Sequence, residues 1–158
     1  MDLTLVLAIL IIGFVTGLRS MTTPAVVAWA AHLGRVSLGT TSLSFMSSPI
    51  AVGIFTLFAI GEYIADLLPN TPNRTSAVGL SARFITGSFS GACLAAATGN
   101  SVALGLISGV AAIGGAFAGF YARTGLVKSL GVKDAFVAIP EDLVAIGLAI
   151  ASICLISR

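Results

Sequence analysis

Charge is scarce in this chain of 158 residues. Lys, Arg, Asp and Glu together make up 9% of the sequence, and 57% of the residues are hydrophobic. A soluble domain has about 25% charged residues, so a surface this poor in charge could not keep a globule of this size in water. The net charge of +2 gives no indication of nucleic-acid binding, and the mean hydropathy of +1.08 indicates that the lipid bilayer surrounds the chain.

Residues that bind metals or carry out catalysis are equally scarce. Cys93 and Cys154 are the only cysteines and lack metal-site spacing, so we expect small buried hydrophobic residues there. His32 is the only histidine, and no Ser-His-Asp pattern accompanies it. The glycine-rich run at residues 109–119 lies inside an apolar segment, which indicates helix packing and not a phosphate loop. We therefore expect no enzyme, no cofactor and no metal site.

Apolar runs follow one another along the whole chain. A membrane-spanning helix needs about 20 apolar residues. Five runs approach or reach that length, at residues 3–18, 49–68, 80–98, 101–122 and 136–156. The first run is not a signal peptide, because Asp2 precedes it and Arg19 closes it on the wrong side. We expect a single multi-pass membrane domain over residues 1–158, since the length suits one domain.

A sixth apolar segment, at residues 23–33, is only about 11 residues, or roughly 16 Å of helix. Thr22 and Thr23 before Pro24 predict its start with a hydroxyl cap, and Gly34 predicts its end. It either spans or re-enters, and a re-entrant backbone needs protein or a water-filled cavity around it. The predicted fold is an all-α integral membrane protein. It would be a bundle of five full transmembrane helices plus one short spanning or re-entrant helix.

The distribution of Lys and Arg predicts the orientation, because cytoplasmic loops carry an excess of both. If residues 23–33 span, six crossings put both termini outside the cytoplasm of a bacterial inner membrane. The cytoplasmic side would then hold Arg19, Arg74, Arg123, Lys128 and Lys133, and the other side Arg35 and Arg158. If the segment is re-entrant, this bias weakens.

Small residues recur at the spacing that lets helix backbones approach closely. The pairs are Gly87-x3-Gly91, Gly105-x3-Gly109 and Gly115-x3-Gly119. These faces either pack within one chain or form the seam of a homodimer, so a homo-oligomer is one expectation.

Charged residues at the boundaries of apolar runs need a physical reason, because a charge at the bilayer centre costs at least ~2.5–3.5 kcal/mol. Glu62 and Asp66 are four residues apart and share one helix face. A bound cation, a proton or an arginine would make this pair tolerable. Glu62 lies about 6 Å deeper, so we expect it to be the more perturbed acid and Asp66 the more solvated one. We also expect Glu62→Gln to leave folding intact.

The remaining boundary charges allow two interpretations each. Arg19, followed by hydroxyls at a helix N-terminus, resembles an anion site, or it simply extends to a lipid headgroup. Glu141 and Asp142 follow Pro140, the expected first helical position, where the helix dipole would stabilise them; alternatively they serve a site. We expect Arg19 or Arg83 to lie within salt-bridge reach of Glu62 or Asp66 and to line a polar cavity.

A weak internal similarity links the two halves, residues 1–75 and 76–158. GLRSMT at 17–22 is similar to GLSARFIT at 79–86, and an acidic pair follows each motif two elements later. Three elements per half would give an inverted repeat, and such repeats place their ligand near the membrane midplane.

Several of these motifs together carry a family resemblance. They are GLRS after the first run, E-x3-D before a proline, an arginine entering the next run, and PEDLVAIGLAI in the last. The chain resembles the domain-of-unknown-function 4126 family of small, multi-pass, mostly bacterial membrane proteins. The resemblance implies the membrane fold, and the family's name records that its function is not established.

The sequence therefore predicts a small transporter or channel-like protein, in which acids carry a proton or cation and arginines hold an anionic group or gate the acids. The alternatives are a non-transporting subunit or assembly factor that packs through glycine-rich faces, and an intramembrane enzyme or lipid-handling protein. The expected partners are the bilayer and a small ion or solute. The predicted binding residues are Arg19, Thr22, Thr23, Glu62, Asp66, Arg83, Glu141 and Asp142.

Overall fold

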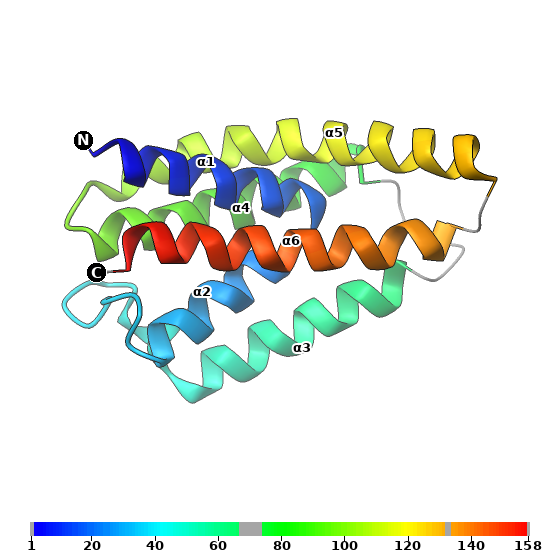
Figure 1. The fold of residues 1–158 in the computed structure, drawn as a ribbon. Helices are drawn as coiled ribbons and strands as arrows, with labels where there is room; N and C mark the ends of the chain where they lie inside the picture. The colour runs from blue at the N-terminus through cyan, green and yellow to red at the C-terminus, as the bar shows by residue number, and fades with distance from the viewer. Residues whose placement is uncertain (1, 67–73, 132–133, 158) are drawn as a thin grey trace.

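The computed structural model describes residues 2–66, 74–131 and 134–157, and every regular element in these ranges is a helix (Figure 1). The elements are α1 (Leu3–Leu18), α2 (Thr22–His32), η1 (Ser44–Ser47), α3 (Pro49–Asp66), α4 (Ala77–Ala97), η2 (Val102–Leu104), α5 (Gly105–Leu130) and α6 (Asp134–Ile156). The all-α expectation is confirmed.

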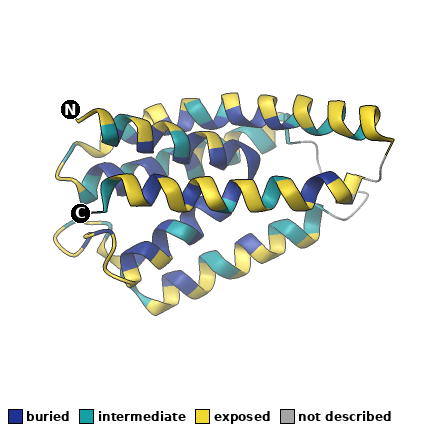
Figure 2. Cartoon of the chain, in the orientation of Figure 1, coloured by how far each residue is buried: buried dark blue, intermediate teal, exposed yellow. Residues whose placement is uncertain are grey.

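Three of the described segments are long and apolar enough to cross a membrane by length and composition, namely Pro49–Asp66, Val102–Leu130 and Phe136–Ile156. Only 17% of the α3 segment is buried inside the protein, and Ile50 and Leu57 on this helix are 74% and 68% exposed. Figure 2 shows the same exposed outer faces on α5 and α6. Apolar surface of this extent needs lipid or a partner to cover it. Five full spans are not confirmed. α1 has only 16 residues, and α4 is not among the described helices that are both long and apolar enough to cross a membrane.

The centre of the bundle is formed by α1, which packs against α4, α5 and α6. Its buried face carries large aliphatic side chains, among them Leu5, Ile9 and Ile12, each at most 2% exposed. Their burial explains why a helix of 16 residues ends inside the protein instead of running through it.

Glycines bring the central helices into close contact. A Cβ at Gly17 would overlap the α5 backbone at Ala112 and Ala116, and a Cβ at Gly115 would overlap the carbonyl of Phe14. On the other side of α5, Gly105 and its pair partner four residues on lie against α4. The Gly-x3-Gly faces are therefore occupied within one chain, so a homodimer would need another surface.

The helices alternate in direction, and both termini lie at the same end of the bundle (Figure 1). At that end Asp2, Arg35 and Asn100 line one shared groove, and Ser157 Oγ donates a hydrogen bond to the Arg35 carbonyl at 3.2 Å. α1 runs away from this end and α2 returns to it, so the turn between them lies within the bundle. Arg19 in this turn is 2% exposed.

Two helix boundaries differ from the prediction. α5 continues past the predicted run of residues 101–122, through Arg123 to Leu130, and ends at Gly131, whose φ of +63° suits glycine. α6 begins at Asp134, so Pro140 is an interior residue and not the first one. Residues 67 and 68 of the predicted run 49–68 lie outside the described residues. So do Lys133 and Arg158, two of the charges that predict the orientation.

The half-repeat is not confirmed. Arg19 follows the last residue of α1, whereas Arg83 lies within the second turn of α4. The acids of α3 occupy its last two turns, whereas those of α6 lie in its third turn. An inverted repeat would place equivalent residues at opposite ends of the bundle, but these charges gather in one place.

Candidate functional site: an ionic cluster at a buried helix turn

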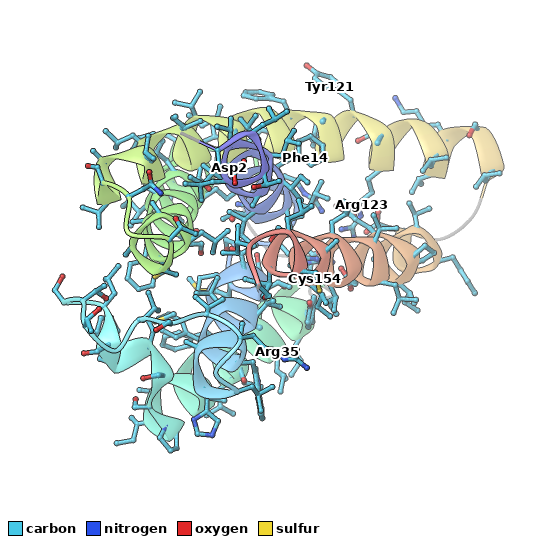
Figure 3. The ribbon with its side chains drawn as sticks, turned by 60° about the vertical axis from the view of Figure 1, so that its left-hand side comes forward. Asp2, Phe14, Arg35, Tyr121, Arg123 and Cys154 are labelled. Atoms are coloured by element: carbon cyan, nitrogen blue, oxygen red, sulfur yellow. The ribbon has the colours of Figure 1, made fainter. Side chains whose placement is uncertain are left out.

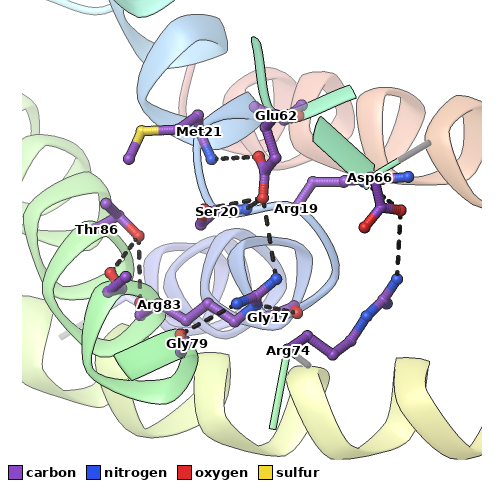
Figure 4. A network of polar contacts seen from close by, with 12 residues as sticks. Gly17, Arg19, Ser20, Met21, Glu62, Asp66, Arg74, Gly79, Arg83 and Thr86 are labelled. Atoms are coloured by element: carbon purple, nitrogen blue, oxygen red, sulfur yellow. Dashed lines mark hydrogen bonds and ion pairs between the residues drawn. The ribbon is translucent and has the colours of Figure 1, made fainter. Parts of the chain in front are cut away.

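Nine charged side chains from the α1–α2 turn, the segment before α4, and helices α3 to α6 gather around the buried turn, and we call them the ionic cluster. Figure 4 shows part of it. Its members are Arg19, Glu62, Asp66, Arg74, Arg83, Arg123, Asp134, Glu141 and Asp142. Ion pairs join seven of them to one another, whereas Glu62 and Arg83 pair with each other and contact the turn through its backbone.

Arg19 is the central residue of the ionic cluster. Its Nη1 lies 2.9 Å from Asp66 Oδ2, and its Nε donates to Asp142 Oδ1 at 2.5 Å. The guanidinium also lies over the ring of Tyr63, 5.2 Å from the ring centroid. These three contacts compensate the desolvation of a side chain that is only 3% exposed, since a buried charge is stable only when paired and hydrogen-bonded.

Arg123 and Arg74 join the remaining acids to this centre. Arg123 Nη1 donates to Asp66 Oδ2 at 2.6 Å, and its Nε donates to Asp134 Oδ1 at 2.8 Å. Arg74 Nη1 donates to Glu141 Oε1 at 2.5 Å. The acids of α6 are thus stabilised by arginines. The expected stabilisation by the helix dipole is wrong, because the dipole acts within the first turn and these acids lie in the third.

Glu62 occupies the N-terminus of α2. Its Oε1 accepts hydrogen bonds from the Ser20 backbone N–H and Oγ, both at 2.9 Å, and its Oε2 accepts one from the Met21 N–H at 2.8 Å. The first N–H groups of a helix have no partner within the helix, and at a buried turn water is excluded as a substitute. A carboxylate from α3 therefore caps α2, at the end where the dipole favours negative charge.

Arg83 caps the other side of the same turn. Its Nε donates to the Gly17 carbonyl at 3.0 Å, one of the last carbonyls of α1, and its Nη1 donates to the Gly79 carbonyl at 3.1 Å. Its Nη2 lies 3.9 Å from Glu62 Oε1. Two opposite charges from α3 and α4 thus satisfy both broken helix ends, as Figure 4 shows.

The threonines of α2 have other partners. The residue before the helix is Met21, with no side-chain cap, so the predicted threonine cap is wrong because Glu62 fills that position. Thr22 Oγ1 lies 2.8 Å from the Tyr63 hydroxyl, beside the ionic cluster. Thr23 is fully buried, and its Oγ1 lies 2.7 Å from Thr16 Oγ1, in a hydroxyl group apart from the charges.

The expected salt bridges are confirmed, since Arg19 pairs with Asp66 and Arg83 with Glu62. Glu62 is also less exposed than Asp66, at 16% against 24% of the side chain. The sequence analysis missed three members of the site, Arg74, Arg123 and Asp134. Arg123 could have been found, because Gly115, Gly119 and Arg123 follow at intervals of four and share the packing face of α5.

A groove of about 390 Å³ opens between α5 and α6 next to the ionic cluster. Its lining is apolar apart from Arg123 and Glu141, so it is not the polar cavity we expected. Glu141 Oε2 has no hydrogen-bond partner within the described ranges, although Arg123 Nη1 lies 3.6 Å away. In the same ranges, no group of three or more His, Cys, Asp and Glu side chains is placed to hold a metal ion.

Fold and site define an all-helical protein of membrane type whose buried charges gather around a helix turn. The family model described as "Domain of unknown function (DUF4126)" matches residues 6–155, and the chain belongs to this family. No curated protein and no solved structure matches it.

Proposed function

We propose that the protein is a small membrane transporter or channel-like protein in which the ionic cluster handles a proton and a small anionic solute. The observation that carries the proposal is the N-terminus of α2 inside the bundle, where Ser20 and Met21 direct two backbone N–H groups at the Glu62 carboxylate. Transporters commonly bind anionic groups at the N-termini of helices that are interrupted within the membrane.

In this arrangement the Glu62 carboxylate fills a position where the N–H groups at the start of α2 could also bind an anion. A proton on Glu62 would remove its charge and weaken its attraction to the helix end and to Arg83. A carboxylate or phosphate group of a solute could then take the same donors, with Arg83 as its cation. Uptake of the proton and binding of the anion would thus be coupled, while Arg19 holds Asp66 and Asp142 in place.

Flux in proteoliposomes tests this proposal. Wild-type protein should take up one of a panel of small anions (chloride, inorganic phosphate, short carboxylates), faster when a pH gradient is imposed. Glu62→Gln should abolish the dependence on the gradient, whereas Asp2→Asn, at an exposed acid outside the ionic cluster, should retain it. Thermal unfolding of each variant establishes that it is folded. Wild-type uptake no faster than that of empty liposomes for every anion would contradict the proposal.

The second candidate function is a non-transporting subunit or assembly factor. Two observations favour it: the four arginines of the ionic cluster are each paired within the chain, and α3 presents an exposed apolar face. Absence of flux together with a stable, stoichiometric complex of the solubilised protein would favour this candidate.

We further propose that the chain lies in a bacterial inner membrane with both termini outside the cytoplasm. The C-terminal end of α5, which carries Arg123 and Lys128, and the N-terminal end of α4, which follows Arg74, lie toward the end of the bundle opposite the termini (Figure 1). This is the expected cytoplasmic side under the positive-inside rule.

A further inference from the structure

A third groove lies between α2 and α6 at the end of the bundle that holds the termini, and it shares Arg35 with the groove lined by Asp2 and Asn100. The volume of this third groove is about 630 Å³. The groove is lined by Val26, Trp29, Ala30 and Leu33 of α2, by Ile150, Ile153, Cys154 and Ser157 at the end of α6, and by Arg35. Arg35 and Cys154 are labelled in Figure 3.

Two matching stripes form the walls. On each wall the residues follow at i, i+3, i+4 and i+7, so each stripe runs along one face of its element. Both elements run toward the same end of the bundle, with α2 inclined to α6 (Figure 1), and the lining residues of the groove follow both of them lengthwise. A groove that runs lengthwise along two helices fits an extended hydrocarbon chain.

The groove is polar only at one end. Arg35 and Ser157 lie beyond the last turns of α2 and α6, and the Ser157 hydroxyl donates a hydrogen bond to the Arg35 backbone carbonyl. The Arg35 side chain is exposed, forms no ion pair with a described residue, and no acid lines the groove. Trp29 is 46% exposed at the wall, as expected for an aromatic residue near the membrane interface. An apolar groove that ends at a cation without an ion-pair partner among the described residues is complementary to an acyl chain that ends in a phosphate.

We propose that this groove binds one anionic phospholipid, with an acyl chain between α2 and α6 and the phosphate on Arg35. One guanidinium near the bilayer surface contributes about 1 kcal/mol toward anionic lipid, which corresponds to a preference of about fivefold over a zwitterionic lipid. The site is independent of the proposed transport function, because none of its residues belongs to the ionic cluster.

Trp29 is the only tryptophan of the chain, so its fluorescence reports on this groove. The protein is reconstituted in phosphatidylcholine nanodiscs that contain increasing fractions of lipid with brominated acyl chains, which quench tryptophan on contact. Brominated phosphatidylglycerol should quench Trp29 at about fivefold lower fractions than brominated phosphatidylcholine. Arg35→Gln should abolish this difference, and Arg35→Lys should retain it. Lys128→Gln, an exposed cation at the opposite end, is the matched control and should behave as wild type.

A variant that fills the groove tests the contribution of the acyl chain independently of that of the headgroup. Cys154→Phe should reduce quenching by both lipids. Equal quenching by both lipids in the wild type, or a preference that persists in Arg35→Gln, would overturn the proposal. Quenching by neither lipid would overturn it as well, because it would mean that another molecule, such as a second copy of the chain, covers the groove.

Discussion

Arg19 and Asp142 lie 123 positions apart in the sequence, yet their side chains form a hydrogen-bonded ion pair with Nε and Oδ1 2.5 Å apart. The pair joins the turn between α1 and α2 to the last helix, α6. Because Asp66 on α3 contacts the same guanidinium, one arginine links three parts of the bundle.

Arg19→Met should therefore destabilise the protein by about 3–5 kcal/mol, because it leaves two carboxylates without their shared cation. Thermal unfolding in detergent measures the loss. Adding Asp142→Asn to this variant should recover part of the stability, since one uncompensated charge is removed. Arg35→Met, at an exposed arginine, is the control and should change stability by less than about 0.5 kcal/mol. A similar small change for Arg19→Met would show that the ion pair contributes nothing.

Glu62→Gln should destabilise the protein by about 1–3 kcal/mol, the cost of an unsatisfied buried group. The glutamine can keep one accepting oxygen toward Ser20, but its NH₂ group would face the Met21 N–H, and two donors cannot pair. This reverses the expectation from the sequence that Glu62→Gln leaves folding intact, which rested on the cost of a buried acid and did not include the backbone N–H groups that Glu62 accepts from. An unchanged melting temperature would restore the earlier expectation.

Two glycines on α1 and α5 should respond in opposite directions to alanine. Gly17→Ala should cost about 1–3 kcal/mol or more, because its Cβ would overlap the α5 backbone, which cannot move aside as a flexible side chain would. Gly114→Ala should be neutral or stabilising by up to about 1 kcal/mol, because nothing lies within 4 Å and alanine is the better helix former. Melting temperatures of the two variants, compared in one detergent, check this prediction. An unchanged melting temperature for Gly17→Ala would contradict the packing of α1 on α5.

Asp134 should contribute to stability at neutral pH and lose that contribution in acid. The hydrogen bond from Arg123 lowers the pKa of this carboxyl below its usual value of 3.8. A lowered pKa means that the ionised form is favoured by folding, so the contribution is complete above the unfolded pKa and disappears as the pH falls through the folded one. Asp134→Asn should therefore melt lower than wild type at about pH 6, and the difference should shrink only as the pH falls below 3.8 and through the lowered folded pKa. A constant difference between the two proteins over this range would contradict it.

Cysteine labelling should place the two ends of the bundle on opposite sides of a membrane. In a background without Cys93 and Cys154, an impermeant maleimide should reach Thr41→Cys and Ser129→Cys from opposite faces of oriented vesicles. Asp2→Cys should be labelled from the same face as Thr41→Cys, because α1 runs out and α2 returns (Figure 1). Labelling of these two from opposite faces would mean that α1 crosses the membrane and α2 does not return.

The sequence predicted the helices well where apolar length decides them. α1 has the expected bounds, and the short α2 has them within one residue. It failed where a charge lies inside a helix, as at Arg123, because a polar residue at the end of an apolar run reads as a loop unless its partners are known. Those partners, Asp66 and Asp134, lie on two other elements, so only the assembled bundle reveals them.

The sequence predicted most of the residues that form the site, but it did not predict which groups each of them binds. The sequence indicated that Glu62 needed a partner and that an arginine would be near. It did not indicate that the partner would be the backbone of Ser20 and Met21, because a helix end is capped in most proteins by residues next to it in the chain. Here the adjacent hydroxyl of Thr22 is bonded to Tyr63, and the cap comes from α3.

The buried turn between α1 and α2 also affects the order in which the helices can enter the membrane during synthesis. Arg19 and the broken helix ends emerge from the ribosome before Glu62 and Arg83, and long before Asp142. Until Glu62 and Arg83 arrive, the hairpin cannot enter hydrocarbon with its backbone satisfied, since each unsatisfied group costs several kcal/mol there. We therefore expect the helices translated first to reach their final depth only after α4 has supplied Arg83, and the ion pair of Arg19 with Asp142 to form last.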